Sequence, residues 1–183
     1  MADELRSRTA RLLTDYLEYC ARRPGAAARL PSSPEAAVLR FLAAQAQQLY
    51  QPVWSRFRGY RGNRIALVAQ VAREMLQDRV PSWGHVVALV AFAGTLLERP
   101  PPGHTRALKE RDAQVDRDCR RLVALLCDWL TGNHRAWLEA QGGWDGFCHV
   151  FNPALKSWSR LLAQILLSCF TATILTYFWT KLS

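Results

Sequence analysis

The histidines and cysteines are the side chains of this sequence best suited to acid–base, nucleophilic or metal chemistry. His85, His104, His134 and His149 are scattered, and no residues around them form a pattern typical of a catalytic triad. The five cysteines are scattered too, and the sequence has neither a Cys-x-x-Cys pair nor a His-Glu-x-x-His motif. A phosphate-binding glycine loop is also missing. The sequence therefore argues against an enzyme and predicts no metal site, no other cofactor and no disulfide framework.

Length and charge set broad limits on the function. The 183 residues carry a formal net charge of +9, which suits either nucleic acid or anionic lipid headgroups. Lysine and arginine are spread along the chain, with no RNA-binding or helix-turn-helix signature beside them. We therefore favour lipid headgroups, or simple solubility, over nucleic acid. The charged start, Met1 to Arg6, has no apolar core of the kind that a signal peptide requires, so we do not expect secretion.

Residues 137–147, which read Trp-Leu-Glu-Ala-Gln-Gly-Gly-Trp-Asp-Gly-Phe, form the most distinctive motif of the sequence. Gly142 and Gly143 permit the left-handed backbone conformations that end a helix. Asp145 can then lie in the first turn of the next helix, where the helix dipole favours a negative charge. Trp144 is expected to pack across the corner between the two helices. The motif therefore predicts two helices joined by a tight corner.

A second motif, Ser82-Trp83-Gly84-His85-Val86-Val87, lies at the start of a long apolar run. Ser82 is a favourable N-cap residue, and Gly84 leaves room for a neighbouring backbone. With His85 neutral, the run from Val80 to Leu97 carries no charge, which is typical of a membrane span or of the central helix of a bundle. The proline before Ser82 and the glycines within the run favour the central helix.

Apolar residues at helical spacing predict helices for the rest of the domain. We expect helices over 5–21, from the Ser33-Pro34-Glu35 start signal to about 51, and over 64–77. An apolar helix over 122–130 is expected to pair with the central run as a hairpin. No alternating strand pattern is present. The predicted fold is all-α: a helical bundle around a central hydrophobic hairpin, followed by a C-terminal transmembrane helix.

The transmembrane helix is predicted from about twenty uncharged residues, Leu161 to Thr180. At ~1.5 Å per residue, a helix of this length spans about 30 Å, the thickness of a bilayer core. Basic residues flank the run, and aromatic residues near its end suit the membrane interface. We therefore divide the chain into a helical domain, 1–155, and a tail anchor, 156–183. The anchor includes Leu161, Ile165, Phe170, Ile174 and Trp179. The alternative is a buried core helix.

Taken together, these motifs resemble the B-cell lymphoma two family of apoptosis regulators over nearly the whole chain. Residues 137–147 are similar to the family's second homology region. Residues 82–94 are similar to its first, with serine in place of asparagine and His85 in place of arginine. In the third region, Ala43-Ala44 stands where the family has Gly-Asp. The predicted N-terminal helix is similar to the fourth region through Leu12, Leu13, Asp15, Tyr16 and Leu17.

The resemblance implies that the domain binds the amphipathic helix of a partner in a hydrophobic groove. The family's arginine pairs with an aspartate of the bound helix through a forked charge, whereas His85 offers at most part of a charge at neutral pH. Without the Gly-Asp of the third region, the chain is expected to receive a helix rather than to donate one. The expected groove has Val68, Val71, Met75 and Leu76 on one wall, Trp83, Gly84, His85, Val86 and Val87 in its middle, and Trp144 and Phe147 at its far end.

The resemblance also implies a biological role. The expected partners are pro-apoptotic relatives, both proteins that carry only the helix and effectors such as Bax. Their capture would keep the outer mitochondrial membrane intact, so we expect an anti-apoptotic regulator. We expect it in the mitochondrial outer membrane or the endoplasmic reticulum membrane, with its domain facing the cytosol. The alternative is a pro-apoptotic or pore-forming member of the same fold, whose hairpin, Val86 to Leu97 plus Leu122 to Leu130, enters the membrane.

Overall fold

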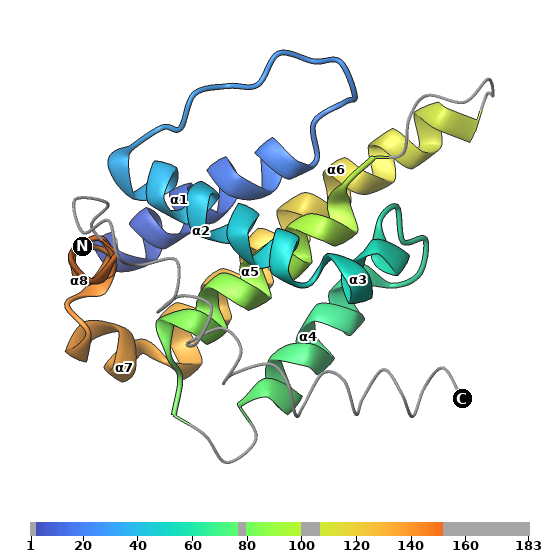
Figure 1. Cartoon of the computed structure of the whole chain (residues 1–183). Coiled ribbons are helices and arrows are strands. Elements are labelled where there is room, and N and C mark those ends of the chain that lie inside the picture. The colour runs from blue at the N-terminus through green and yellow to red at the C-terminus, as the bar shows by residue number, and fades with distance from the viewer. Residues whose placement is uncertain (1–2, 77–79, 100–106, 152–183) are drawn as a thin grey trace.

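The computed structural model describes residues 3–76, 80–99 and 107–151, and every regular element within these ranges is helical (Figure 1). The predicted all-α fold is therefore confirmed for this part of the chain. The elements are α1 (Glu4–Cys20), α2 (Pro34–Leu49), α3 (Gln51–Trp54), the 3-10 turn η1 (Ser55–Phe57), α4 (Arg64–Met75), α5 (Trp83–Leu97), α6 (Ala107–Asp128), the π-helical turn η2 (Trp129–Asn133), α7 (Arg135–Ala140) and α8 (Gly143–Val150).

Helix α5 is the buried centre of the bundle, as the uncharged run predicted. Every residue from Trp83 to Leu97 is buried, and α1, α2, α4 and α6 all contact this helix. The helix begins at Trp83 rather than at Val80, because the extended backbone of Ser82 caps it: the Ser82 side chain accepts a hydrogen bond from the backbone N–H of His85.

The second helix ends at Leu49, within two residues of its predicted end. Pro52 lacks the N–H that would continue it, and the short α3 follows. One predicted helix boundary was wrong. The helix predicted over 122–130 starts at Ala107 and is 22 residues long. The first half of this helix carries many charged residues. The prediction was based on the apolar run and therefore included only the second half. Figure 1 shows α6 lying alongside α5.

Helix α1 packs closely against α5 at Gly94. A Cβ atom at this position would lie 2.7 Å from the Cys20 sulfur and 2.8 Å from the Tyr16 hydroxyl oxygen. Only a glycine therefore allows the two helices this separation without displacing a buried side chain. Burial raises the pKa of the Cys20 thiol to about 12, so this cysteine behaves as a packing residue rather than as a nucleophile.

The predicted tail lies outside the described residues. Residues 152–183 include the predicted anchor residues Leu161, Ile165, Phe170, Ile174 and Trp179. Among the helices of the described ranges, none combines the length and the hydropathy needed to cross a bilayer.

Candidate functional site

The structure brings the two most distinctive motifs together around Trp83. Its indole ring lies 5.7 Å from the ring of Trp144, 5.0 Å from that of Phe147 and 5.0 Å from that of Trp137, measured between centroids. Phe151 extends the group by packing on Phe147 at 5.1 Å. We call these five residues the aromatic cluster. Tilted and edge-to-face ring pairs of this kind stabilise a fold beyond the area that they bury. The cluster therefore joins the start of α5 to α7 and α8.

The corner between α7 and α8 follows the geometry predicted from its glycines. Gly142 and Gly143 have positive φ angles of 77° and 59°, which favour glycine. A third glycine, Gly146, was missed by the sequence analysis. A Cβ atom there would lie 1.7 Å from the carbonyl oxygen of Gln141, so the last turn of α7 packs against the backbone of α8. The third glycine of the motif, directly after Asp145, was the available signal.

The start of α1 holds this corner through adjacent residues. The indole N–H of Trp144 donates to the Thr9 hydroxyl oxygen at 2.8 Å, with both side chains buried. Asp145 lies in the first turn of α8, as predicted, and it accepts two hydrogen bonds from Arg8, at 2.7 and 3.0 Å. The Arg8 guanidinium lowers the pKa of Asp145 and also pairs with Glu35 at the start of α2. The roles of Arg8 and Thr9 were not predicted.

The N-terminal homology helix packs as its apolar stripe predicted. Leu12, Leu13, Tyr16 and Leu17 are buried on the face of α1 that meets the bundle. Asp15 joins α1 to α2: it accepts a hydrogen bond from the Arg40 guanidinium at 2.8 Å and another from the backbone N–H of Ser32 at 2.9 Å. This helix therefore contacts both the region resembling the third homology motif and the corner of the second.

His85 is part of the helix start. Its Nδ1 accepts a hydrogen bond from the backbone N–H of Ser82 at 3.2 Å, and the Ser82 side chain accepts from the backbone N–H of His85 at 3.3 Å. This reciprocal pattern is a capping box in which histidine takes the place of the usual glutamate or glutamine. Only 5% of His85 is exposed. The structure thus gives His85 a structural role, and its contact with a ligand aspartate stays a prediction.

Nearly all predicted groove residues are buried. Leu76, at the end of α4, is half-buried. Because the same apolar side chains serve as core, the chain holds them in its interior rather than on an open surface. Their role in holding a partner helix stays a prediction. The buried members are Val68, Val71, Met75, Trp83, Gly84, His85, Val86, Val87, Trp144 and Phe147.

Metal chemistry finds no support in the described ranges, where no three histidine, cysteine, aspartate or glutamate side chains lie close enough to hold an ion. The arrangement is instead suited to packing and helix contacts: an apolar central helix, an aromatic cluster at its start and a corner held by α1.

Comparison with known proteins agrees with this arrangement. Residues 36–144 match the family described as "Apoptosis regulator proteins, Bcl-2 family". Human Bcl-2-like protein 10 is 53% identical, covering 100% of this chain and 95% of its own length. The anti-apoptotic protein NR13 of Gallus gallus is 36% identical, covering 82% of this chain and 80% of its own length.

Two solved structures are also similar. The solution structure of a divergent Bcl-2 protein is 46% identical with a TM-score of 0.69, and covers 82% of this chain and 91% of its own. The crystal structure of the zebrafish pro-survival protein NRZ in complex with Bad BH3 is 30% identical with a TM-score of 0.64, and covers 80% of this chain and 94% of its own. Since the family match spans more than half of the sequence and a relative that is 53% identical covers all of it, the chain belongs to the Bcl-2 family of apoptosis regulators.

Proposed function

We propose that this chain is an anti-apoptotic regulator that captures the amphipathic death-motif helix of pro-apoptotic relatives. The observation that carries the proposal is the packing of Trp83 against Trp144 and Phe147, because it joins the two motifs expected to form the middle and the far end of the groove. The similarity to NR13, which is named as anti-apoptotic, and to NRZ, whose structure was solved with Bad BH3, also supports an anti-apoptotic role.

The burial and sequence of α2 support the proposal that this chain receives a partner's helix rather than donating one. Its inward face, Leu39, Leu42, Ala43 and Ala46, is buried in the chain's own core. Ala44, which follows Ala43, has no carboxylate with which α2 could bind the groove of another family member. A helix used in this way contributes to the core of its own domain, so the partner's helix must come from another protein.

The partners that we propose are helix-only pro-apoptotic proteins and effectors such as Bax. Because the groove residues of the free chain are buried, binding requires some of their side chains to rearrange. Four apolar anchors of an incoming helix, at spacings of three and four residues, would then replace these internal contacts.

The test is a titration of the full-length chain in nonionic detergent with a Bad-type helix peptide. We expect saturable binding that is lost when the peptide's anchor residues are replaced by alanine. Leu76→Glu, at the one half-buried position among the groove residues, should weaken binding. Leu30→Glu, on a loop residue that is 87% exposed, is the matched control and should not. Equal affinities for the two variants would place the site elsewhere.

The proposed location is the mitochondrial outer membrane or the reticulum membrane, through the uncharged run Leu161 to Thr180. A chain truncated before Leu161 should lose resistance to carbonate extraction from membranes while keeping its helical circular-dichroism spectrum. A truncated chain that still pellets with the membranes would contradict the anchor.

The second candidate is a pore-forming role within the same fold, which the buried, predominantly apolar α5 and the apolar end of its neighbour α6 favour. Dye release from cardiolipin-containing liposomes separates the two candidates. We expect the chain to suppress release that Bax causes and to cause none alone. Release by the chain alone would support the pore-forming role.

A further inference from the structure

Asp3, the N-cap of α1, and the first two turns of this helix contact α2, the end of α6, η2, α7 and α8. We propose that Asp3, Arg6, Arg8 and Thr9, here called the clasp, position the α7–α8 corner and thereby set the affinity of the partner-helix site. This inference rests on the proposed function of that site.

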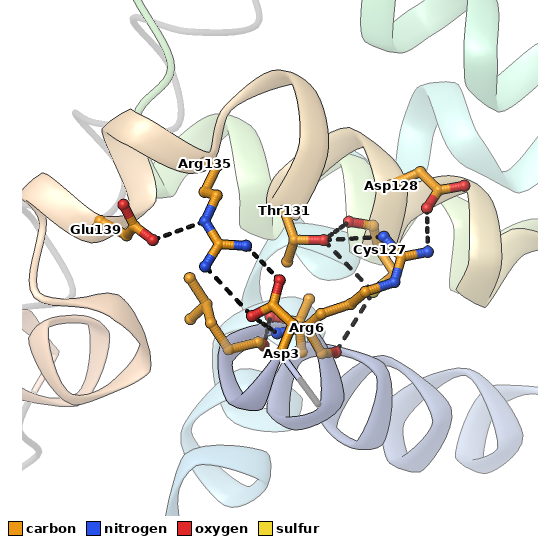
Figure 2. Close-up of polar contacts among 9 residues, drawn as sticks. Asp3, Arg6, Cys127, Asp128, Thr131, Arg135 and Glu139 are labelled. Atoms are coloured by element: carbon orange, nitrogen blue, oxygen red, sulfur yellow. Dashed lines mark hydrogen bonds and ion pairs between the residues drawn. The ribbon is translucent and has the colours of Figure 1, made fainter. Parts of the chain in front are cut away.

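One arm of the clasp holds the end of α6 and the start of α7 (Figure 2). Asp3 pairs with Arg135, the first residue of α7, and Arg135 also donates to Glu139 at 2.7 Å. Arg6 pairs with Asp128 at the end of α6 and donates to the Thr131 hydroxyl at 3.4 Å. Figure 2 shows Arg6 reaching from α1 to both of these side chains.

This arm acts on an irregular part of the backbone. Between α6 and α7 the chain forms the π-helical turn η2, Trp129–Asn133, and such turns interrupt a helix where its direction can change. Thr131 donates back to the Cys127 carbonyl at 2.8 Å, and the Cys127 thiol donates to the Arg6 carbonyl at 3.5 Å. The backbone of α1 is thus connected to the point at which α6 gives way to α7.

The other arm holds α8. Arg8 pairs with Asp145, and Thr9 accepts the hydrogen bond of the Trp144 indole. Arg8 is also shared with Glu35, which fixes its position between α2 and α8. Figure 1 shows α8 beside the start of α1.

Both arms lead to Trp83. Arg135 lies two residues before Trp137, whose ring is 5.0 Å from that of Trp83, and Trp144 packs on Trp83 from α8 at 5.7 Å. Trp83 is the first residue of α5 and the first residue of the predicted middle of the groove, Trp83 to Val87. A shift of α7 or α8 therefore reaches the start of the central helix through ring packing alone.

The clasp differs from most of the contacts that stabilise the fold. Apart from Thr9, which belongs to the clasp, the α1 side chains that face the core are apolar. Asp3, Arg6 and Arg8 instead form charge pairs near the surface, which contribute little to stability one at a time. Breaking one pair should leave the bundle folded but loosen the corner. Mutations of residues that connect two sites typically change the affinity at one of the sites by about twofold to thirtyfold.

The experiment uses the full-length chain in nonionic detergent, with the Bad-type helix peptide as the probe. Arg6→Asp places a carboxylate against Asp128, and adding Asp128→Arg restores the pair in reverse. Asp15→Asn is the control, because it breaks a more buried pair, between α1 and α2, and leaves the α7–α8 contacts in place. The indole signals of Trp83 and Trp144 in a ¹⁵N–¹H spectrum report the corner. The buried Trp83 N–H has no hydrogen-bond partner in the described part of the chain, so its signal follows ring packing.

We expect Arg6→Asp to weaken peptide binding about threefold to tenfold and to shift both indole signals, and the reversed pair to recover both. Asp15→Asn should lower the unfolding midpoint without shifting these signals or changing affinity. Unchanged affinity in Arg6→Asp would overturn the inference, and so would equal loss in Asp15→Asn, which would indicate general destabilisation. Failure of the unmodified chain to bind the peptide would instead contradict the proposed function.

Discussion

The Arg64 guanidinium donates to the Asp118 carboxylate at 2.7 Å, and this ion pair joins the first residue of α4 to the middle of α6 inside the protein. Arg64 also donates to the carbonyl of Leu96 at 2.9 Å, near the end of α5, and Asp118 accepts a further bond from Gln114 at 2.8 Å. Both charges are therefore paired and hydrogen-bonded, although their side chains are only 8% and 6% exposed. The pair fixes α4, the predicted groove wall, against the two central helices.

Removing one member of this pair should be far more damaging than removing both. We expect Asp118→Asn to lower the free energy of unfolding by about 3–5 kcal/mol, because it leaves Arg64 buried without an opposite charge. The double variant Arg64→Met, Asp118→Leu should recover much of that loss. Urea denaturation followed by circular dichroism measures both changes. Asp116→Asn, at a side chain that is 54% exposed, is the control and should lose less than about 1 kcal/mol.

Adding a single methyl group at Gly146 should destabilise the α7–α8 corner. Gly146→Ala would force the new Cβ against the Gln141 carbonyl, so we expect a loss of several degrees in the unfolding midpoint, together with changed tryptophan fluorescence from the aromatic cluster. Gly132→Ala is the matched control, because a Cβ at that position meets nothing within 4 Å. Equal midpoints for the two variants would show that the corner opens without loss of stability.

His85 should be replaceable by glutamine but not by leucine. Glutamine can accept the hydrogen bond from the Ser82 N–H that His85 Nδ1 accepts now. We expect His85→Gln to retain the stability of the unmodified chain and His85→Leu to lose about 1 kcal/mol, as for loss of a cap. Thermal unfolding checks this. If His85 also faces a ligand aspartate, His85→Arg should bind the helix peptide more tightly than His85→Gln does, and equal affinities would leave only the structural role.

Acid should weaken the clasp by protonating Asp3, which pairs with Arg135, and Asp145, which pairs with Arg8. The Arg8 guanidinium lowers the pKa of Asp145, and Arg135 lowers the pKa of Asp3. Each pair therefore contributes stability above the ordinary aspartate value of 3.8, and that contribution is lost as the pH falls through the lower pKa of the folded state. A carbon-13 NMR titration from pH 6 to about pH 2 measures both groups. Arg8→Gln should raise the pKa of Asp145 towards 3.8 and leave Asp3 unchanged.

The sequence by itself determined the helical class and most of the helix positions. Apolar residues three and four apart define α1 and α4, and the uncharged run from Val80 to Leu97 predicted a helix buried on all sides. The N-caps Ser33 and Ser82, and the glycines before Trp144, were readable because caps and positive φ angles depend on neighbouring residues only. These features depend on residues that are close together in the chain, so the sequence alone is enough to predict them.

The tertiary structure alone decided which distant groups meet. Asp145 was predicted to lie in the first turn of its helix, but its partner Arg8 is 137 residues away. The need for glycine at position 146 comes from a backbone oxygen that packs against it. His85 resembled a ligand-facing arginine by position, yet its ring is used to cap α5. Such roles depend on how the helices pack. Burial and pairing are decided by contacts between different helices, and the spacing of residues along a single helix does not show these contacts.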